Sequence, residues 1–292
     1  YGISNGESAD AKAVNHTVIS AIGETLGAPF KDHEDSSRNN GCPVFVWELP
    51  MYKFNGSGTQ DKPYRIRNKE ELVQLSEYLN DPVYNSMFNK ASYQQTADID
   101  LKGIVWKPMA GNRTAAFNGT YDGACHIISN LTVNNDRFGG LFGYISVGTV
   151  KNLVINNGSI TAKTTAGGIT AQLGNGAVIS QCAYNGTVSA DVAGGLVGEA
   201  FDGSSINSSY CNGNITGKTA AGGIVGSATF RGAKANNCYH GEGSIKAESA
   251  GGIAGISNTD TAITNSYYIK GSASGTTINS DGTAVSDKLM KS

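Results

Sequence analysis

A five-residue glycine phrase recurs five times in the second half of this chain. In each copy two glycines precede an aliphatic residue, and a glycine or alanine closes the phrase two residues later. The copies begin at Gly139, Gly167, Gly194, Gly222 and Gly251, so the successive intervals are 28, 27, 28 and 29 residues. A fixed period in this range is typical of repeat architectures in which each unit contacts only its neighbours. The chain is therefore expected to fold as a stack of similar units.

Short runs of β-branched residues alternate with Gly and Asn turns inside each interval. Residues 178–190, which read VISQCAYNGTVSA, show the pattern. Such runs predict strands, and nothing in the repeats has a helical period. One interval with two or three strands has the right size for one coil of a parallel β-helix, whose coils stack about 4.8 Å apart. We therefore predict an all-β solenoid with its repeats in residues 139–270.

The glycine pairs and the residue after them have a physical role in such a solenoid. A glycine pair allows either a backbone with positive φ or a close approach between stacked coils. The aliphatic residue next to each pair is expected to point inward, where full burial contributes about 1.5–3 kcal/mol. The internal ladder predicted in this way consists of Leu141, Ile169, Leu196, Ile224 and Ile253.

Residues 51–138 precede the repeats and carry a helix signal. Asn68 and Glu71 stand at N-cap and capping-box positions. The leucines that follow on one face are Leu72, Leu75 and Leu79. These features predict a short amphipathic helix near residues 69–80, which Asp81-Pro82 ends. Because the end of a solenoid needs a cover, we expect this helix to be a cap, and the rest of the segment to form the first, irregular coils.

The order of phrases in this segment is similar to that of a known family. The phrases are residues 61–66 (DKPYRI), the helix, Asp98 to Leu101, Trp106-x-Pro108, Phe117-x-Gly-x-x-Asp122-Gly123 and His126-x-Ile128-x-x-Leu131. With the glycine repeats they resemble the GLUG-motif family over about residues 50–270, although Ala171 stands where a last glycine is expected. That family occurs in large secreted or surface-attached bacterial proteins, including adhesins and non-catalytic regions of immunoglobulin A proteases. The resemblance implies a right-handed parallel β-helix.

The two ends of the chain resemble the segment that closes such an array. Residues 26–31 and 40–47 carry this resemblance near the start, and residues 286–290 carry it near the end. The resemblance implies that residues 1–50 close a preceding repeat unit or form an N-terminal extension. It also implies that residues 271–292 begin a closing segment or linker, with neighbouring domains in a longer chain.

Composition excludes several classes of partner. The net charge is −2, with 22 basic and 24 acidic residues, and no run of Lys or Arg suits a series of phosphates, so nucleic acid is not an expected partner. No stretch approaches the ~20 apolar residues that span a bilayer, so membrane insertion is not expected. The five cysteines form no C-x-x-C pair. Cys182, Cys211 and Cys238 fall at similar places in successive repeats and are expected to be buried thiols, with a disulfide or reactive thiol as the alternative.

The carboxylates do not form an evident catalytic set. β-Helical enzymes of polysaccharides cluster carboxylates on adjacent coils. The acids between residues 139 and 270 sit at differing offsets in their units: Asp191, Glu199, Asp202, Glu242, Glu248 and Asp260. No catalytic residue and no cofactor is therefore predicted. Asp98, Asp100 and Asp122 are either calcium ligands or turn carboxylates that accept backbone N–H groups, and the turn interpretation is favoured, so no metal site is predicted.

A tyrosine series is the most suggestive surface candidate. Tyr184, Tyr210, Tyr239 and Tyr267 each lie 15 or 16 residues after the second glycine of their unit. Aromatic rings stack on sugar faces and anchor interfaces, but they equally fill stacked cores. Cys182 precedes Tyr184 by two residues, whereas Cys211 directly follows Tyr210, so the sequence leaves the facing of the tyrosines open.

These patterns together predict a non-enzymatic, secreted or cell-surface domain of a bacterial protein. Its expected role is adhesion to an extracellular glycan or protein, or that of a stalk that presents other domains. The alternative is a polysaccharide-active enzyme or the accessory carbohydrate-binding region of one. A carboxylate cluster aligned in a groove would favour the alternative, and a regular flank without such a cluster would favour adhesion.

Overall fold

The computed structural model describes residues 30–31, 44–45 and 54–290, and contacts divide the chain into the units Tyr1–Lys53 and Phe54–Ser292. In the first unit, strand β1 (Phe30–Lys31) pairs antiparallel with β2 (Val44–Phe45). The other expectations for residues 1–50 lie outside the described residues. Everything that follows concerns the second unit.

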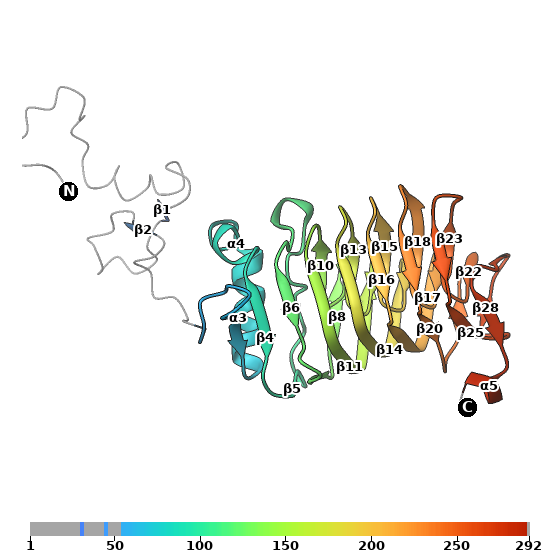
Figure 1. The fold of residues 1–292 in the computed structure, drawn as a ribbon, viewed down its shortest axis with the longest axis horizontal. Coiled ribbons are helices and arrows are strands. Elements are labelled where there is room, and N and C mark those ends of the chain that lie inside the picture. The colour runs from blue at the N-terminus through green and yellow to red at the C-terminus, as the bar shows by residue number, and fades with distance from the viewer. Residues whose placement is uncertain (1–29, 32–43, 46–53, 291–292) are drawn as a thin grey trace, which may run out of the picture. The chain divides into compact units, whose positions relative to one another are not determined.

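The second unit is a parallel β-helix, as predicted. A five-stranded sheet forms one face, in the order β10 (Phe142–Ile145), β13 (Thr170–Leu173), β15 (Val197–Phe201), β18 (Val225–Phe230) and β23 (Ala254–Ser257). The longest strands of the other sheet are β11 (Thr149–Ala162), β14 (Val178–Gly194) and β17 (Tyr210–Gly222). Neighbouring strands come from successive coils and pair in parallel (Figure 1).

The remaining strands are short and belong to the larger sheet. They are β3 (Tyr64–Ile66), β4 (Ser92–Gln95), β5 (Ile99–Asp100), β6 (Thr120–Asp122), β7 (Ile127–Ser129), β8 (Thr132–Asn135), β9 (Phe138–Gly139), β12 (Thr165–Gly167), β16 (Ser205–Asn207), β19 (Lys234–Asn236), β20 (Tyr239–His240), β21 (Ile245–Lys246), β22 (Ser249–Gly251), β24 (Ala262–Thr264), β25 (Tyr267–Ile269), β26 (Ala273–Ser274), β27 (Thr277–Asn279) and β28 (Thr283–Val285). Strands β26, β27 and β28 pair with β21, β22 and β25, so coil-to-coil pairing continues past residue 270. A short helix, α5 (Asp287–Met290), follows.

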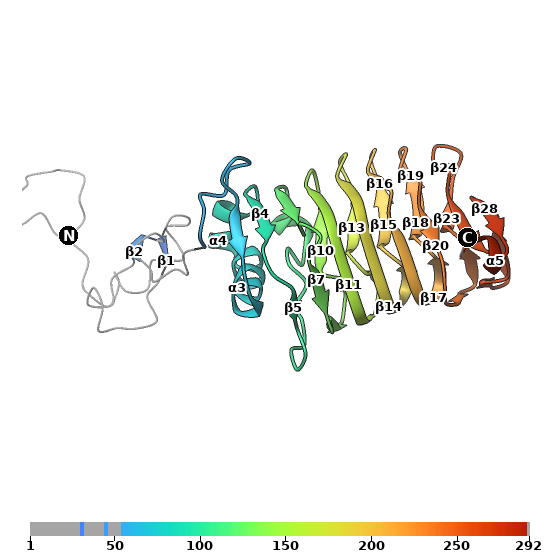
Figure 2. The same ribbon diagram turned by 60° about the horizontal axis from the view of Figure 1, so that its bottom comes forward.

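Two helices lie at the N-terminal end of the β-helix (Figures 1 and 2). Helix α3 (Lys69–Asn80) has the predicted bounds, and the side chain of its N-cap, Asn68, accepts a hydrogen bond from the backbone of Glu71. The Glu71 carboxylate accepts from the backbone N–H of Arg67 at 2.7 Å, one residue before the expected capping-box partner. Helix α4 (Pro82–Phe88) follows directly, because Asp81 caps it and proline is favoured in a first helical turn. Helix α4 was not predicted from the sequence.

Helix α3 is held on the end of the solenoid by its buried face and by polar contacts. Its three leucines are fully buried. The Ser76 hydroxyl donates to the carbonyl of Lys107 at 2.7 Å, and the Asn80 amide donates to the carbonyl of Pro108 at 2.9 Å. The Asn80 side-chain oxygen accepts from the backbone of Gly111 at 2.8 Å. The predicted amphipathic helix therefore covers the first coils.

The predicted internal ladder is present. All five aliphatic residues that follow the glycine pairs have 0% exposure. Backbone hydrogen bonds join neighbouring members: Ile169 donates to Leu196, Leu196 to Ile224, and Ile224 to Ile253, each at 2.9–3.0 Å. The same residues therefore fill the apolar core with their side chains and link neighbouring coils with their backbone hydrogen bonds.

Close approach, rather than positive φ, explains the glycine pairs. Within the five pairs only Gly140 has a positive φ. A Cβ added at Gly194 would lie 1.8 Å from the carbonyl oxygen of Val197, and one added at Gly195 would lie 2.0 Å from the carbonyl oxygen of Gly223 in the next coil. Real Cβ atoms do not approach oxygen so closely, so any larger residue requires the backbone to shift.

A mixed column of side chains fills the space opposite the second glycine of the last four pairs. Strand register places Tyr184, Cys211, His240 and Tyr268 beside one another in successive coils. An added Cβ would lie within 2.0–2.7 Å of these side chains at the facing glycines, Gly168, Gly195, Gly223 and Gly252. The glycines therefore make room for a column whose members differ in size.

The cysteines occupy two columns, which corrects the single position expected for them. Cys182 and Cys238 share one column with Ser209 and Ser266, whereas Cys211 belongs to the column of Tyr184. The strand register gives the reason: Cys211 pairs with Tyr184, two residues after Cys182, so it lies two positions further along its coil than Cys182 does. All three cysteines are buried and free, as predicted.

His240 makes the stability of the solenoid sensitive to acid. Burial lowers the pKa of this imidazole, although a hydrogen-bond contact of 3.1 Å between its Nε2 and the Gly213 carbonyl acts in the opposite direction. In the unfolded chain a histidine binds a proton below about pH 6.5, whereas burial in the folded chain disfavours protonation of His240 at the same pH. The free energy of unfolding is therefore expected to decrease as the pH falls below about 6.5.

Urea titrations at pH 7.5 and 5.5 test this expectation. Replacement His240→Phe should reduce the acid-dependent loss of unfolding free energy, whereas His126→Phe, at a partly exposed side chain, should retain it. An equal loss in the wild type and in His240→Phe would contradict the assignment.

Candidate binding groove

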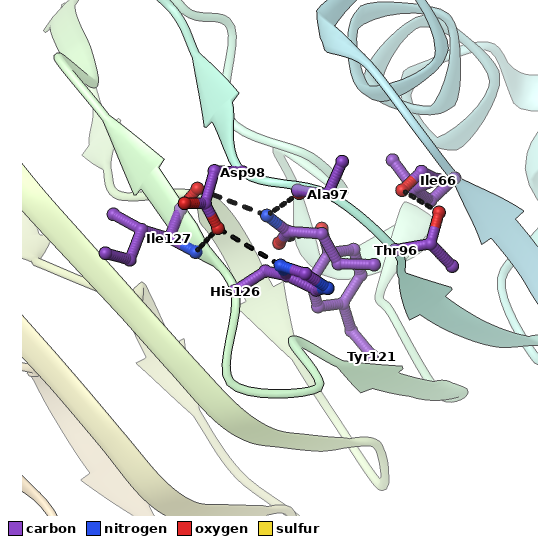
Figure 3. A network of polar contacts seen from close by, with 8 residues as sticks. Ile66, Thr96, Ala97, Asp98, Tyr121, His126 and Ile127 are labelled. Carbon is purple, nitrogen blue, oxygen red and sulfur yellow. Dashed lines mark hydrogen bonds and ion pairs between the residues drawn. The ribbon is translucent and has the colours of Figure 1, made fainter.

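The three aspartates considered as calcium ligands or turn carboxylates all accept hydrogen bonds from backbone N–H groups. Asp98 accepts hydrogen bonds from the backbone of Ile127 at 3.0 Å and from the ring of His126 at 3.1 Å, both in the next coil (Figure 3). The bond from Ile127, followed by that from His126, lowers the pKa of Asp98. Asp100 accepts from Asn130 and from the backbone of Lys102, and these bonds likewise lower its pKa.

Asp122 completes the series. It accepts from the backbone of Ala124 at 2.8 Å and from the Asn152 amide at 3.0 Å. Asp100 and Asp122 thus accept a backbone N–H within their own turns, as the turn interpretation predicts, whereas Asp98 accepts one from the next coil. Within the described residues, no group of three or more His, Cys, Asp or Glu side chains is arranged to hold a metal ion.

The four tyrosines of the series lie on the larger sheet but do not all face the same way. Tyr184 is fully buried, whereas Tyr210, Tyr239 and Tyr267 form a separate, outward column. The rings of Tyr210 and Tyr239 stack with centroids 4.9 Å apart and planes 4° from parallel. Because these two rings cover each other's inner faces, the stack leaves less aromatic surface for a sugar than two separate rings would. The facing that the sequence left open is thus resolved: Tyr184 lies one residue out of register with the other three tyrosines and faces inward.

An open groove on the flank of the five-stranded sheet is a stronger candidate. Its volume is about 430 Å³, and its lining residues are Arg113, Glu199, Ala200, Phe201, Asp202, Ser227 and Arg231. They come from a short 3-10 helix, η3 (Arg113–Ala115), from the end of β15 and from β18 with their following turns. The groove therefore crosses neighbouring coils and includes a residue from the irregular first part of the solenoid.

Arg113 is fixed in place by contacts with distant coils. Its Nε donates to the Gln172 side-chain oxygen at 3.0 Å. Its guanidinium carbon lies 5.2 Å from the ring centre of Phe201 and 5.9 Å from that of Tyr144. The two rings are themselves stacked, with centroids 6.0 Å apart. A guanidinium over aromatic faces is a favourable cation–π arrangement, so the arginine is held before any ligand arrives.

Gln172 links this arginine to the first carboxylate of the groove. While its oxygen accepts from Arg113, its amide nitrogen donates to Glu199 at 2.6 Å. Gln172 and Glu199 are register partners on β13 and β15, and Gln172 is buried. The buried amide thus sets the relative positions of one donor and one acceptor at the groove.

Asp202 and Arg231 stand on stacked turns at the rim. Both have positive φ, 50° and 47°, and each precedes a glycine. The Gly203 N–H donates to the Arg231 carbonyl at 2.8 Å, and the Gly176 N–H donates to the Asp202 carbonyl at 2.9 Å. Identical turns in successive coils therefore bring an acidic and a basic side chain to the same edge.

The groove carries balanced charge and mixed hydrogen-bonding capacity. Two carboxylates accept hydrogen bonds, two guanidinium groups donate them, and the Ser227 hydroxyl does both. In the sequence, Glu199 and Asp202 sit at differing offsets in their repeat units, and no motif marks either arginine. Arg113 precedes Gln172 by 59 residues and lies outside the repeats, so no periodic signal marks it.

Comparisons with known proteins agree with the fold. No family model matches the chain. A halomucin from Haloquadratum walsbyi is 33% identical over 128 residues, which cover 39% of this chain and 1% of the halomucin. The crystal structure of a proposed immunoglobulin A1 protease from Bacteroides ovatus is similar with a TM-score of 0.64 and 24% identity, and the match covers 82% of this chain and 88% of that one.

A second solved structure, named IgA1 protease, has a TM-score of 0.50 and 20% identity, over 70% of this chain and 16% of its own. The chain thus spans a small fraction of the halomucin and of this second protein. The likeness to the two solved structures is one of fold. In the part of the chain that the structure describes, no helix combines the length and the apolar character needed to cross a bilayer.

Proposed function

We propose that this chain is a non-enzymatic, extracellular repeat domain that adheres to a glycan or protein ligand and presents neighbouring domains of a longer bacterial protein. The observation that carries the proposal is the groove of Arg113, Glu199, Asp202 and Arg231 on the flank of a rigid β-helix. It offers prearranged donors and acceptors on the outside of a fully packed wall.

Rigidity supports a binding role. Gln172 holds the side chains of Arg113 and Glu199 through hydrogen bonds between coils, and the stacked turns hold the backbone at Asp202 and Arg231. A site held in this way loses little conformational entropy when a ligand binds. When such domains are repeated along one chain, individually weak contacts add to a much higher avidity.

The similar proteins support a place outside the cell. The two solved structures are named for a protease of immunoglobulin A1, which is an extracellular protein, and their fold is shared by this chain. The phrase order from Gly56 to Val133 together with the glycine repeats supports membership of the GLUG-motif family as part of the same proposal.

A combined binding and product assay tests the proposal. The purified chain is incubated with arrayed bacterial, plant and mucin glycans, matrix proteins and immunoglobulin A1, and both capture and new reducing or unsaturated sugar ends are followed. Capture without product is expected. Sugar product would contradict the proposal in favour of the polysaccharide-active enzyme, and the absence of both signals would contradict adhesion and favour a passive stalk.

A further inference from the structure

We infer that the groove accommodates a neutral saccharide residue, bound through its hydroxyl groups by the carboxylates of Glu199 and Asp202 and the guanidinium groups of Arg113 and Arg231. The inference rests on the proposed adhesive function and specifies its ligand. The same chemistry occurs in free polysaccharides and in the glycans of glycoproteins.

Size excludes a folded partner as the direct occupant. A volume of about 430 Å³ lies near the lower end of the range for small-molecule sites. A stable protein interface needs about 800 Å² from each partner, which a groove of this size does not supply. A sugar residue, alone or within a chain that runs along the open groove, fits the available space.

Charge balance argues against a strongly charged ligand. The groove contains two guanidinium groups and two carboxylates. An anion is therefore repelled by Glu199 and Asp202, and a cation is repelled by Arg113 and Arg231. Charge complementarity, which would select either kind of ion, is therefore weak. A neutral ligand avoids both penalties.

Hydroxyl groups match the lining because each one both donates and accepts. Glu199 and Asp202 accept from sugar hydroxyls, while Arg113, Arg231 and Ser227 donate to their oxygens. Hydrogen bonds to ionised groups are stronger than neutral ones. Ala200 and Phe201, which are both buried, add the apolar part of the lining.

Existing contacts orient the acceptors and leave capacity for a ligand. One oxygen of Glu199 accepts from Gln172 at 2.6 Å, and a carboxylate has about four lone-pair sites. Asp202 is held by a backbone turn through Gly176 and Gly203, so that its position does not depend on its own carboxylate. Replacement of either carboxylate by its amide should therefore preserve the fold and remove only acceptor strength.

Titrations followed by amide chemical shifts in NMR test the inference. The probes are the methyl glycosides of glucose, galactose and mannose, short neutral oligosaccharides, glucuronic acid and glucosamine, each added to the full chain. At least one neutral probe should saturate and shift the amide signals of residues 199–203 and of Ser227. Glu199→Gln and Asp202→Asn should each weaken this binding about tenfold or more. Glu248→Gln, an exposed carboxylate outside the groove, serves as the matched control and should change nothing.

Different results would contradict the groove assignment and the adhesive function. Neutral-sugar binding that is unchanged in Glu199→Gln and Asp202→Asn, or a charged sugar that binds tenfold more tightly than every neutral one, overturns the groove assignment and leaves adhesion intact. The same holds if no sugar probe binds while the array still captures a ligand. If neither assay yields a ligand, both proposals are overturned.

Discussion

Leu196→Asp is expected to remove most of the stability of the β-helix. The side chain has 0% exposure, and its backbone is hydrogen-bonded to the ladder residues on both sides, Ile169 and Ile224. A carboxylate at this position would be buried without a partner, at a cost of several kcal/mol. Since folded domains are stable by only about 5–15 kcal/mol, the variant should be largely unfolded or melt at a much lower temperature. Circular dichroism during thermal and urea unfolding provides the measurement.

Val147→Asp is the matched control for this change. Val147 is 59% exposed, so the same apolar-to-acid replacement there should alter the unfolding free energy by no more than about 0.5 kcal/mol. A melting temperature of Leu196→Asp equal to that of Val147→Asp would contradict the inward ladder.

Gly195→Ala is expected to destabilise the contact between two neighbouring coils strongly. The added carbon would lie 2.0 Å from the Gly223 carbonyl oxygen and 2.7 Å from the Cβ of Cys211. A backbone oxygen cannot rotate away as a side chain can, so the two coils must separate and strain their hydrogen bonds. Overpacking costs about 1–3 kcal/mol even where side chains can adjust, and the loss here should be at the upper end or above it.

Gly111→Ala supplies the comparison, because its nearest neighbour is the side-chain oxygen of Asn80 at 3.1 Å. Urea unfolding of both variants should show a clearly smaller loss for Gly111→Ala. Similar losses would mean that intrinsic backbone preference, and not contact between coils, explains the glycine pairs.

Periodicity made the solenoid predictable, because each repeat places the same residue type at the same point of a coil. The ladder from Leu141 to Ile253 and the helix of residues 69–80 followed from spacing and capping alone. Helix α4 was missed because Asp81-Pro82 reads equally as the end of one helix and the start of another. Both interpretations hold at that position.

The strand register and the groove were harder to predict from the sequence. A shift of one residue moves a side chain to the other side of a strand, so the 15- or 16-residue spacing could not separate buried Tyr184 from exposed Tyr239 and Tyr267. The groove depends on Arg113, which reaches it through an irregular loop. Such a contact is a product of three-dimensional packing and leaves no repeated pattern in the chain.

The alternation of cysteine and serine in one internal column has a redox consequence. Cys182 and Cys238 are separated by the coil of Ser209, which places them about 9.6 Å apart at the usual strand spacing. Cysteines bridged by a disulfide have Cα atoms within about 7 Å. Burial also raises the pKa of Cys182 to about 12 and of Cys238 to about 11, so the reactive thiolate is scarce. Oxidising conditions are therefore not expected to join these two thiols in a disulfide, so the column can keep its cysteines reduced without a reducing environment.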